Sequence, residues 1–468
     1  MRALIVGSGL AGLSCALELA RSGWEVEVIT AARAGQDGAT HRVHALAPWI
    51  LLTAPWVRGD SPRRFLADLE ARAGGLRRPG LAEVLAAEAH RCGEDLCDLL
   101  ELRRVDHEPV LLPGDSSPRG LRVLPPEGRP LLAPLVAACR EAKVRLAEGR
   151  LAVGLLRGET GGVSGVLACD RRTATVSERR ASAVVLACGG PGGVFPLTTS
   201  PRWCRGSGLA LARRAGSLLH NAQLTQALPL MAARPRFFPT SAVLLAGEIE
   251  IGGTARPPAA DLVEVTVAVA EACVAGIPAA LRPLSTAESG LPAGVRSSRV
   301  FRIEGKVPLT VALHHGIGGV GIDAWGRASL PGLYACGEAA GGVQGARRTM
   351  GTGLLEARVF GLRVARAVVH DRERLDAAET PVRYDLCPGA ADARALEGRL
   401  DELMGPLTVI REEAAVGRVI EELKAWPRIT GGEAASGSEF LAGLRLEAAL
   451  AILEATLDAA AQARARPG

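Results

Sequence analysis

Residues 3–12 read Ala-Leu-Ile-Val-Gly-Ser-Gly-Leu-Ala-Gly, and this stretch decides the fold. Its first four residues predict a short buried strand, and Gly7, Gly9 and Gly12 then have the spacing of a dinucleotide-binding turn. In such a turn the first glycine permits a tight bend, the second lets a pyrophosphate approach the backbone, and the third lets the next helix pack on the strand. The phosphates would face the positive end of that helix. The predicted phosphate site consists of Gly7, Ser8, Gly9, Leu10, Ala11 and Gly12.

The residues after this turn predict a βαβ unit. Apolar residues recur at helical spacing from Leu13 to Ser22, and Gly23 stands where helices commonly end. The segment Glu25–Thr30 then has the pattern of a second strand. An acid that binds a ribose hydroxyl usually closes that strand, but here Thr30 takes its place. Thr30 therefore argues against a freely exchanging NAD, whereas FAD tolerates the change because many other contacts hold it.

Composition describes an ordinary globular protein. The chain has 468 residues, of which 48% are hydrophobic, enough for two or three domains. Its 55 Lys and Arg nearly balance 50 Asp and Glu, and no basic block concentrates the net charge of +5, so nucleic acid is not indicated. The ten cysteines lack Cys-x-x-Cys spacing, so we expect no metal site and a reducing compartment. Because neither a signal region nor a long apolar run is evident, we expect a cytoplasmic protein without a membrane anchor.

Further along, the chain alternates helices and strands around one irregular insertion. The patterns predict helices between 61 and 102, a hairpin over 150–167, strands within 183–190 and 330–338, and helices over 354–369, 400–423 and 439–463. A proline-rich stretch from about 226 to 305 looks like an inserted unit. The order of these elements predicts an α/β fold.

Four later segments carry a resemblance to a known family. They are His314–Val320, Leu330–Glu338, Gln344–Arg348 and Leu354–Gly361. With the N-terminal turn, they closely resemble the FAD domain of the succinate dehydrogenase and fumarate reductase flavoprotein superfamily, and within it are most similar to the compact L-aspartate oxidases. The matching family motifs include His-Tyr-x-Met-Gly-Gly, His-Gly-Ala-Asn-Arg and Asn-Ser-Leu-Leu-Glu. The resemblance spans most of the chain to about Gly361.

This resemblance implies FAD as the cofactor. Its pyrophosphate would lie on the glycine turn, its ribityl chain would meet Glu338, and its isoalloxazine would lie at the helix start near Gly353 and Leu354. His41 is near the position where membrane-complex members bind FAD covalently, but its surroundings lack the family's Ala-Gln-Gly-Gly, and a solvated loop histidine is the commoner explanation. The cofactor residues expected beyond the glycine turn are Thr30, Ala39, Thr40, Ala152, Gly189, Glu338, Gly353 and Leu354.

The resemblance also implies how the chain is divided. We expect an FAD-binding Rossmann-like domain of the glutathione-reductase type over residues 1–225 and 305–370. A small capping domain inserted over 226–304 would cover the substrate, and a helical C-terminal region would occupy 371–468.

The family's substrates are C4 dicarboxylates, and part of their binding set is retained. His314 matches the substrate-binding histidine, and Arg348 matches the arginine that grips a carboxylate, for which a guanidinium is suited. The capping segment departs from the pattern. Leu228 replaces a substrate histidine, and Arg256 is the nearest candidate for the proton-transferring arginine. The other departures are Ala246 and Gly247 in place of Thr-Glu, and Ala260 in place of that arginine before Asp261.

Three functions follow from these matches and departures. The leading hypothesis is oxidation of a small amino or carboxylic acid by hydride transfer to flavin N5, as L-aspartate oxidase converts L-aspartate to iminoaspartate in NAD biosynthesis, with oxygen or fumarate as electron acceptor. A second is a fumarate or succinate type of reductase or dehydrogenase acting on another acid. The third is a degenerate paralogue that keeps FAD as structure and acts through a partner subunit. The departures leave the substrate open.

Overall fold

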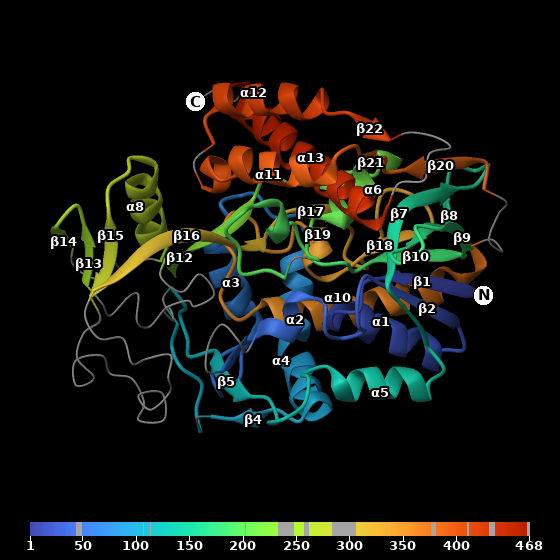
Figure 1. Cartoon of the computed structure of the whole chain (residues 1–468). Helices are drawn as coiled ribbons and strands as arrows, with labels where there is room; N and C mark the ends of the chain where they lie inside the picture. Colours follow the sequence, from blue (N-terminus) through green and yellow to red (C-terminus); the bar gives the residue numbers. More distant parts are fainter. Residues whose placement is uncertain are drawn as a thin grey trace.

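The computed structural model describes residues 1–43, 49–105, 107–112, 114–201, 203–232, 248–256, 262–282, 306–375, 381–409, 411–429 and 436–465, with the backbone alone at Arg256 and Leu262. Figure 1 shows layered sheet and helices with a separate unit projecting to one side. Within the described ranges, no helix combines the length and apolarity needed to cross a membrane.

A parallel five-stranded sheet forms the centre. In spatial order its strands are β18 (Leu333–Ala335), β10 (Ala183–Leu186), β1 (Arg2–Val6), β2 (Glu25–Thr30) and β6 (Arg145–Glu148). Every neighbouring pair is parallel. Strands β1 and β10 consist of apolar residues that are buried almost throughout, as expected for parallel strands covered on both faces. The strands predicted from the sequence are therefore present.

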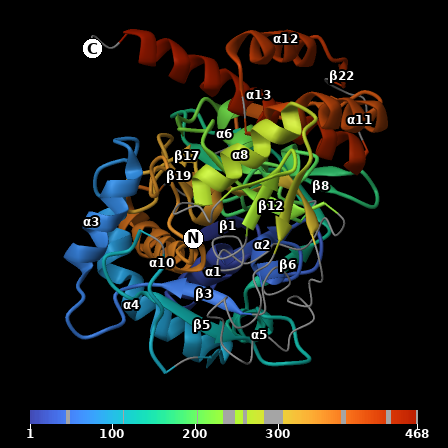
Figure 2. The ribbon, with the colours of Figure 1, turned by 90° about the vertical axis from the view of Figure 1, so that its left-hand side faces the viewer.

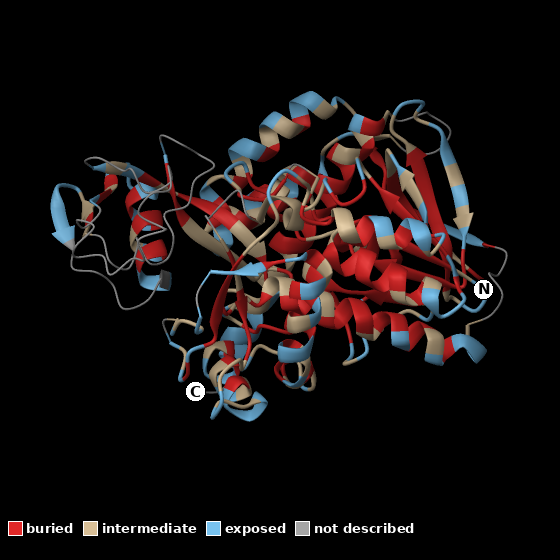
Figure 3. Cartoon of the chain, turned by 90° about the horizontal axis from the view of Figure 1, so that it is seen from below, coloured by how far each residue is buried: buried red, intermediate tan, exposed pale blue. Residues whose placement is uncertain are grey.

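Helices cover one face of this sheet. They include α1 (Leu10–Arg21), α3 (Pro62–Ala73), α4 (Leu81–Leu100), α5 (Ala133–Glu141) and α10 (Gly353–His370). Helix α1 packs against α10 so closely that a Cβ built on Gly361 would lie 2.7 Å from the Ala11 carbonyl oxygen. Gly74, with φ +56°, ends α3, and Gly80, with φ +86°, precedes α4, so the helical stretch predicted between 61 and 102 consists of two helices. Figure 3 shows buried residues gathered in the centre of the molecule, with exposed residues along the outer sides of the helices.

An antiparallel sheet lies on the other side of the parallel sheet. Its order is β20 (Arg383–Leu386), β7 (Arg150–Arg157), β8 (Val163–Asp170) and β9 (Val176–Arg180). The β7–β8 pair is the predicted hairpin, and Gly161 at its turn has φ +80°. Smaller elements complete this part of the molecule: α2 (Ala39–Arg42), β3 (Ile50–Thr53), β4 (Arg103–Arg104), β5 (Gly120–Leu124), α6 (Ser207–Ala215), β11 (Leu219–His220), β17 (Gly319–Gly321) and β19 (Ala340–Gly341).

The projecting unit has its own sheet and helix. The sheet order is β12 (Thr225–Met231), β16 (Val307–Gly316), β15 (Ala279–Arg282), β13 (Glu248–Ile251) and β14 (Thr254–Arg256), covered by α8 (Leu262–Val274). Val265 and Val269 of α8 are buried with Ile249 and Leu281 in a small core of this unit. Figure 2 shows α8 on the side facing the viewer. The domain boundaries at 226 and 304 stay a prediction, since residues 283–305 lie outside the described ranges.

The C-terminal region is mainly helical. It contains α11 (Ala393–Met404), α12 (Glu413–Lys424) and α13 (Gly437–Ala465), with short strands β21 (Gly389–Ala390) and β22 (Arg428–Ile429). The stretch 400–423, predicted to be rich in helix, contains the end of α11 and most of α12, and the two helices are separated after Met404 by Gly405 and Pro406. The proline ring fixes φ and removes a backbone donor, so it stands in the first turn of a new short helix instead.

Candidate functional site

The glycine turn joins β1 to α1 through two very close contacts. Gly7 has φ +112°, and a Cβ there would lie 2.3 Å from the Ala187 carbonyl oxygen. A Cβ on Gly12 would lie 2.1 Å from the Gly7 carbonyl oxygen. The Cβ of any residue larger than glycine would collide with backbone at both positions. Gly9 differs, because its φ is −73° and the nearest atom to an added Cβ is Thr40 Oγ1 at 3.7 Å. Gly7 and Gly12 thus permit the packing, whereas Gly9 leaves room in front of the α1 N-terminus.

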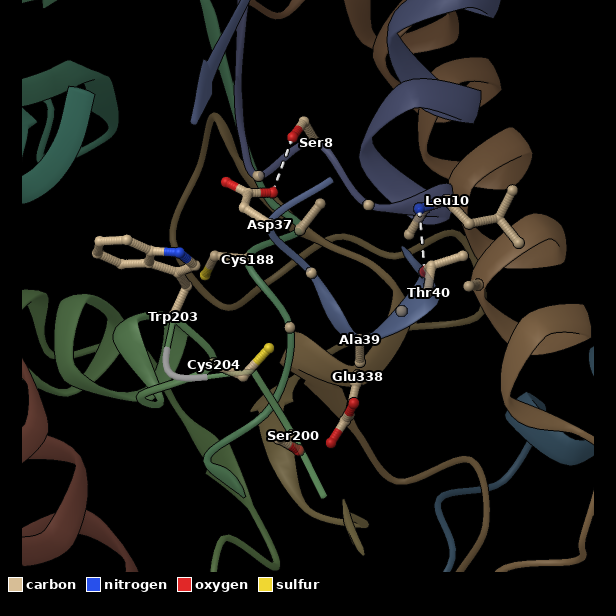
Figure 4. Close-up of a pocket in the computed structure, with 18 of the residues that line it drawn as sticks. Ser8, Leu10, Asp37, Ala39, Thr40, Cys188, Ser200, Trp203, Cys204 and Glu338 are labelled. Carbon is tan, nitrogen blue, oxygen red and sulfur yellow. Dashed lines mark hydrogen bonds between the residues drawn. The ribbon is translucent and has the colours of Figure 1, made fainter. Parts of the chain in front are cut away.

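The turn opens into a pocket that brings distant segments together, here called the glycine-turn pocket. Residues from β1, β2, α2, β7, β16 and the starts of α1 and α10 line it, together with the segments that directly follow β10 and β18. The predicted cofactor residues that line it are Gly7, Ser8, Gly9, Leu10, Ala11, Thr30, Ala39, Thr40, Ala152, Gly189, Glu338, Gly353 and Leu354. Gly12 lies behind the turn, and His41 is not among the lining residues. Figure 4 shows Thr40 beside the first turn of α1, where its hydroxyl accepts from the Leu10 N–H at 3.4 Å.

Asp37 is a pocket residue that the sequence reasoning missed. The loop after β2 turns back so that Thr30 Oγ1 donates to Asp37 Oδ2 at 2.5 Å and Ser8 Oγ donates to Asp37 Oδ1 at 3.1 Å. The Ala32 N–H also donates to this carboxylate, at 3.2 Å. Figure 4 shows Ser8 and Asp37 facing each other across the pocket end. A carboxylate thus lies beside the end of β2 although it comes from seven residues further along the chain. In the sequence Asp37 is a single acid in a loop, and no motif spacing identifies such a residue as part of a site.

Glu338 is held at the other end of the pocket. Its Oε1 accepts from the Gly316 N–H at 2.8 Å and lies 3.5 Å from His315 Nδ1. Burial raises the pKa of Glu338 to about 7, against its ordinary value of 4.5, although the Gly316 N–H and Arg348 oppose the shift. The carboxyl group is thus placed as an acceptor that is partly protonated near neutral pH.

Arg348 and His314, the two predicted substrate residues, both line the glycine-turn pocket. Arg348 Nη1 donates to Gln226 Oε1 at 3.2 Å, and its Nε is buried without a hydrogen-bond partner among the described residues. His314 Nδ1 lies 3.0 Å from Thr199 Oγ1. Burial, with the nearby Arg348 charge, lowers the pKa of His314 to about 3. His314 is therefore neutral at physiological pH and offers a hydrogen bond without a charge.

A buried network supports the loop that carries Arg348. Gln344 Nε2 donates to Glu356 Oε2 at 2.6 Å and to Thr352 Oγ1 at 3.1 Å, which ties this loop to the start of α10. Burial raises the pKa of Glu356 to about 7, and the Arg348 charge opposes that shift. The Arg348 guanidinium is thus buried, and the charges of Glu356 and Glu338 act on it.

Arg348 also lines a second cavity of about 610 Å³, here called the Arg348 cavity. It lies where β12 and α8 of the projecting unit meet the Arg348 loop. Leu228 lines it, in agreement with the predicted place of the missing substrate histidine. So does Arg411, which the sequence reasoning passed over and which donates to Thr225 Oγ1 at 2.8 Å. Arg348 therefore stands between the two pockets.

For the remaining predicted residues of the projecting unit, the described part of the structure gives no side-chain position. Arg256 ends β14 and pairs with Ile249, and its side chain lies outside the described residues. Ala246, Gly247 and Ala260 also lie outside them. Their roles stay a prediction.

Comparisons with known proteins agree with this geometry. The family model for the FAD binding domain matches residues 2–253 and 268–354. The L-aspartate oxidase of Caulobacter vibrioides is 31% identical, over 90% of this chain and 86% of that protein. The L-aspartate oxidase of Bacillus subtilis is 28% identical, over 90% of this chain and 81% of that protein.

Solved structures share the fold at lower identity. The Sdh1 structure of Mycobacterium smegmatis superposes with a TM-score of 0.78 at 21% identity and covers 99% of this chain and 87% of that one. The Escherichia coli quinol fumarate reductase FrdA superposes with a TM-score of 0.77 at 19% identity, covering 100% of this chain and 89% of that one. At these identities the likeness concerns the fold alone.

Proposed function

The chain belongs to the FAD binding domain family, within the succinate dehydrogenase and fumarate reductase flavoprotein superfamily, and from this premise we propose that it oxidises a small amino or carboxylic acid held by Arg348. Membership confirms the predicted α/β FAD-binding fold and the predicted cofactor. The chain is thus an FAD-dependent oxidoreductase of this family, and the proposal concerns its substrate and site residues.

The residues of the glycine-turn pocket fit FAD. The space in front of Gly9 would be filled by any Cβ, and the α1 N-terminus faces it with backbone N–H groups that suit a pyrophosphate. Asp37 and Glu338 offer carboxylate acceptors for ribose and ribityl hydroxyls at opposite ends. Bound FAD supplies a two-electron acceptor that takes hydride from the substrate carbon.

Arg348 is the residue on which the proposal depends. Its buried Nε has no partner among the described residues, and leaving such a donor unpaired is costly, so a carboxylate that binds there would be stabilised. Because Arg348 lines both pockets, an acid bound to it would place its α-carbon near the cofactor and its side chain in the Arg348 cavity. Neutral His314 would donate or accept one more hydrogen bond.

L-Aspartate is the first substrate to test, because curated relatives named L-aspartate oxidase match most of this chain. In that reaction the substrate carbon gives up hydride with its electron pair, a proton leaves the amine, and iminoaspartate, a precursor in NAD biosynthesis, forms. Oxygen or fumarate would accept the electrons afterwards. Succinate and related acids test the alternative reaction.

The experiment is anaerobic titration of the purified holoprotein with L-aspartate, succinate and a panel of related acids while the visible flavin absorbance is recorded. We expect at least one acid to bleach the flavin, and Arg348→Ala to keep its flavin but lose this response. A holoprotein whose flavin stays oxidised with every acid would refute the proposal. A protein that is purified without bound flavin would contradict the proposed function before any titration.

A further inference from the structure

The Arg348 cavity has a charged end and an apolar wall. Arg348 lies at the end shared with the glycine-turn pocket, so it fixes where a carboxylate binds. The wall across the cavity includes Leu228 of β12 with Val263 and Val267 of α8. A ligand held by its carboxylate at Arg348 would direct its side chain toward this wall.

The apolar wall comes from one face of α8. Val263 and Val267 are four positions apart in the helix, so their side chains lie on the same face. Each is 39% exposed, whereas Val265 and Val269 on the opposite face are buried in the core of the projecting unit. Large apolar side chains that stay accessible inside a cavity favour an apolar ligand, because contact removes their surface from water.

Arg72, Arg347 and Arg411 also line this cavity, and the contacts of Arg72 and Arg411 show what these two side chains hold. Arg72 forms an ion pair with Asp115 at 2.7 Å. The three guanidinium nitrogens of Arg411 donate to the Leu407 and Gln223 carbonyl oxygens and to Thr225 Oγ1. They tie β12 to the C-terminal region and so position this strand. By contrast, the Nε of Arg348 is the donor that still needs a partner.

The charges and size of the cavity also disfavour a four-carbon diacid. The Asp115 carboxylate that lines the cavity is paired with Arg72, so this pair offers no free cation for a second carboxylate, and Leu228 offers no hydrogen bond where the family has a histidine. A cavity of about 610 Å³ is in the range that takes drug-sized ligands, far larger than such a diacid requires.

We propose that the substrate is a monocarboxylic amino acid or related acid with a bulky apolar side chain, bound by its carboxylate at Arg348 and by its side chain against Leu228, Val263 and Val267. This rests on the proposed function for its reaction, but the binding preference can be measured without turnover. Burial of a side chain the size of Leu or Phe predicts about ten- to a hundredfold tighter binding than for a diacid.

The test uses the holoprotein and two probes, 3-phenylpropionate and succinate, whose dissociation constants are read from the shift in the absorbance of the oxidised flavin on binding. We expect 3-phenylpropionate to bind at least tenfold more tightly. Leu228→His should narrow or reverse this ratio, and Val267→Ser should weaken 3-phenylpropionate alone. Val274→Ser is the matched control, because Val274 is on α8 and 63% exposed but does not line the cavity.

Anaerobic reduction by L-phenylalanine, L-leucine and L-aspartate then separates the two proposals. Faster flavin reduction by the apolar amino acids supports both. Tighter binding of succinate, faster reduction by L-aspartate, or no response to either probe overturns the apolar pocket. If 3-phenylpropionate binds tightly but no acid reduces the flavin, the pocket stands and the proposed oxidation fails. If Leu228→His does not fold, the effect of Val267→Ser on 3-phenylpropionate binding still tests the apolar pocket.

Discussion

Two glycines of the N-terminal turn should respond differently to replacement by alanine. Gly12→Ala should lower the stability of the fold, whereas Gly9→Ala should mainly weaken FAD binding. In Gly12→Ala, the new Cβ would lie 2.1 Å from the Gly7 carbonyl oxygen, more than 1 Å inside a normal contact distance of about 3.5 Å. The strain of moving α1 away from the turn costs about 1–3 kcal/mol, offset by about 1 kcal/mol of better helix propensity. We expect a net loss of up to about 2 kcal/mol in the unfolding free energy.

Gly9→Ala should leave the fold nearly intact. Gly9 has an ordinary φ of −73°, and its added Cβ has no neighbour closer than 3.7 Å. A poorer helix N-cap costs about 1 kcal/mol at most. The methyl group would, however, occupy the space where the pyrophosphate approaches α1, so we expect FAD to bind at least tenfold more weakly, equal to about 1.4 kcal/mol.

Urea unfolding of FAD-free protein and titration with FAD, followed by quenching of flavin fluorescence, measure the two effects. Gly398→Ala in α11 is the matched control, since nothing lies within 4 Å of its added Cβ. That variant should gain about 1 kcal/mol and keep its FAD affinity. Wild-type FAD affinity in Gly9→Ala would refute the pyrophosphate placement. A Gly12→Ala protein as stable as the control would refute the close packing of turn and helix.

Three other predictions follow from the site. Asp37→Asn should weaken FAD binding about tenfold in the same fluorescence titration, because a charged acceptor for a hydroxyl is lost, and unchanged affinity would remove Asp37 from the ribose site. Burial raises the pKa of Glu356 from 4.5 to about 7, so the folded state keeps a proton that the unfolded state releases, and this contribution to stability is present below pH 4.5 and lost as pH rises to 7. Urea unfolding should therefore show that the unfolding free energy declines less between pH 5 and pH 8 in Glu356→Gln than in the wild type, with a difference of about 3 kcal/mol between the two proteins. Equal declines in the two proteins would contradict the assigned pKa. Arg348→Lys should retain flavin but lose about 10- to 100-fold in kcat/KM for the best acid, because the bidentate fork is lost, and undiminished kcat/KM would show that Arg348 does not grip the carboxylate.

Much of the cofactor site was predictable because its signals are local. The spacing of Gly7, Gly9 and Gly12 reflects contacts between a strand and the helix that directly follows it. Glu338 follows the short apolar strand β18, and the carboxyl ends of parallel strands meet at one edge of a sheet, whereas Gly353 begins the helix α10. The position of such residues in the pocket does not depend on the conformation of the loops between the elements.

The amino-acid sequence by itself therefore determined the βαβ start and the FAD-binding family, and it predicted Arg348 as the carboxylate ligand. Only the tertiary structure decided that Asp37 returns to Thr30 and Ser8, because a loop's path depends on what it packs against. It also decided that Leu228 faces Val263 and Val267 across one cavity, with Arg348 at its end. Strand pairing and helix packing create that neighbourhood between distant segments, and no periodicity along the chain encodes it.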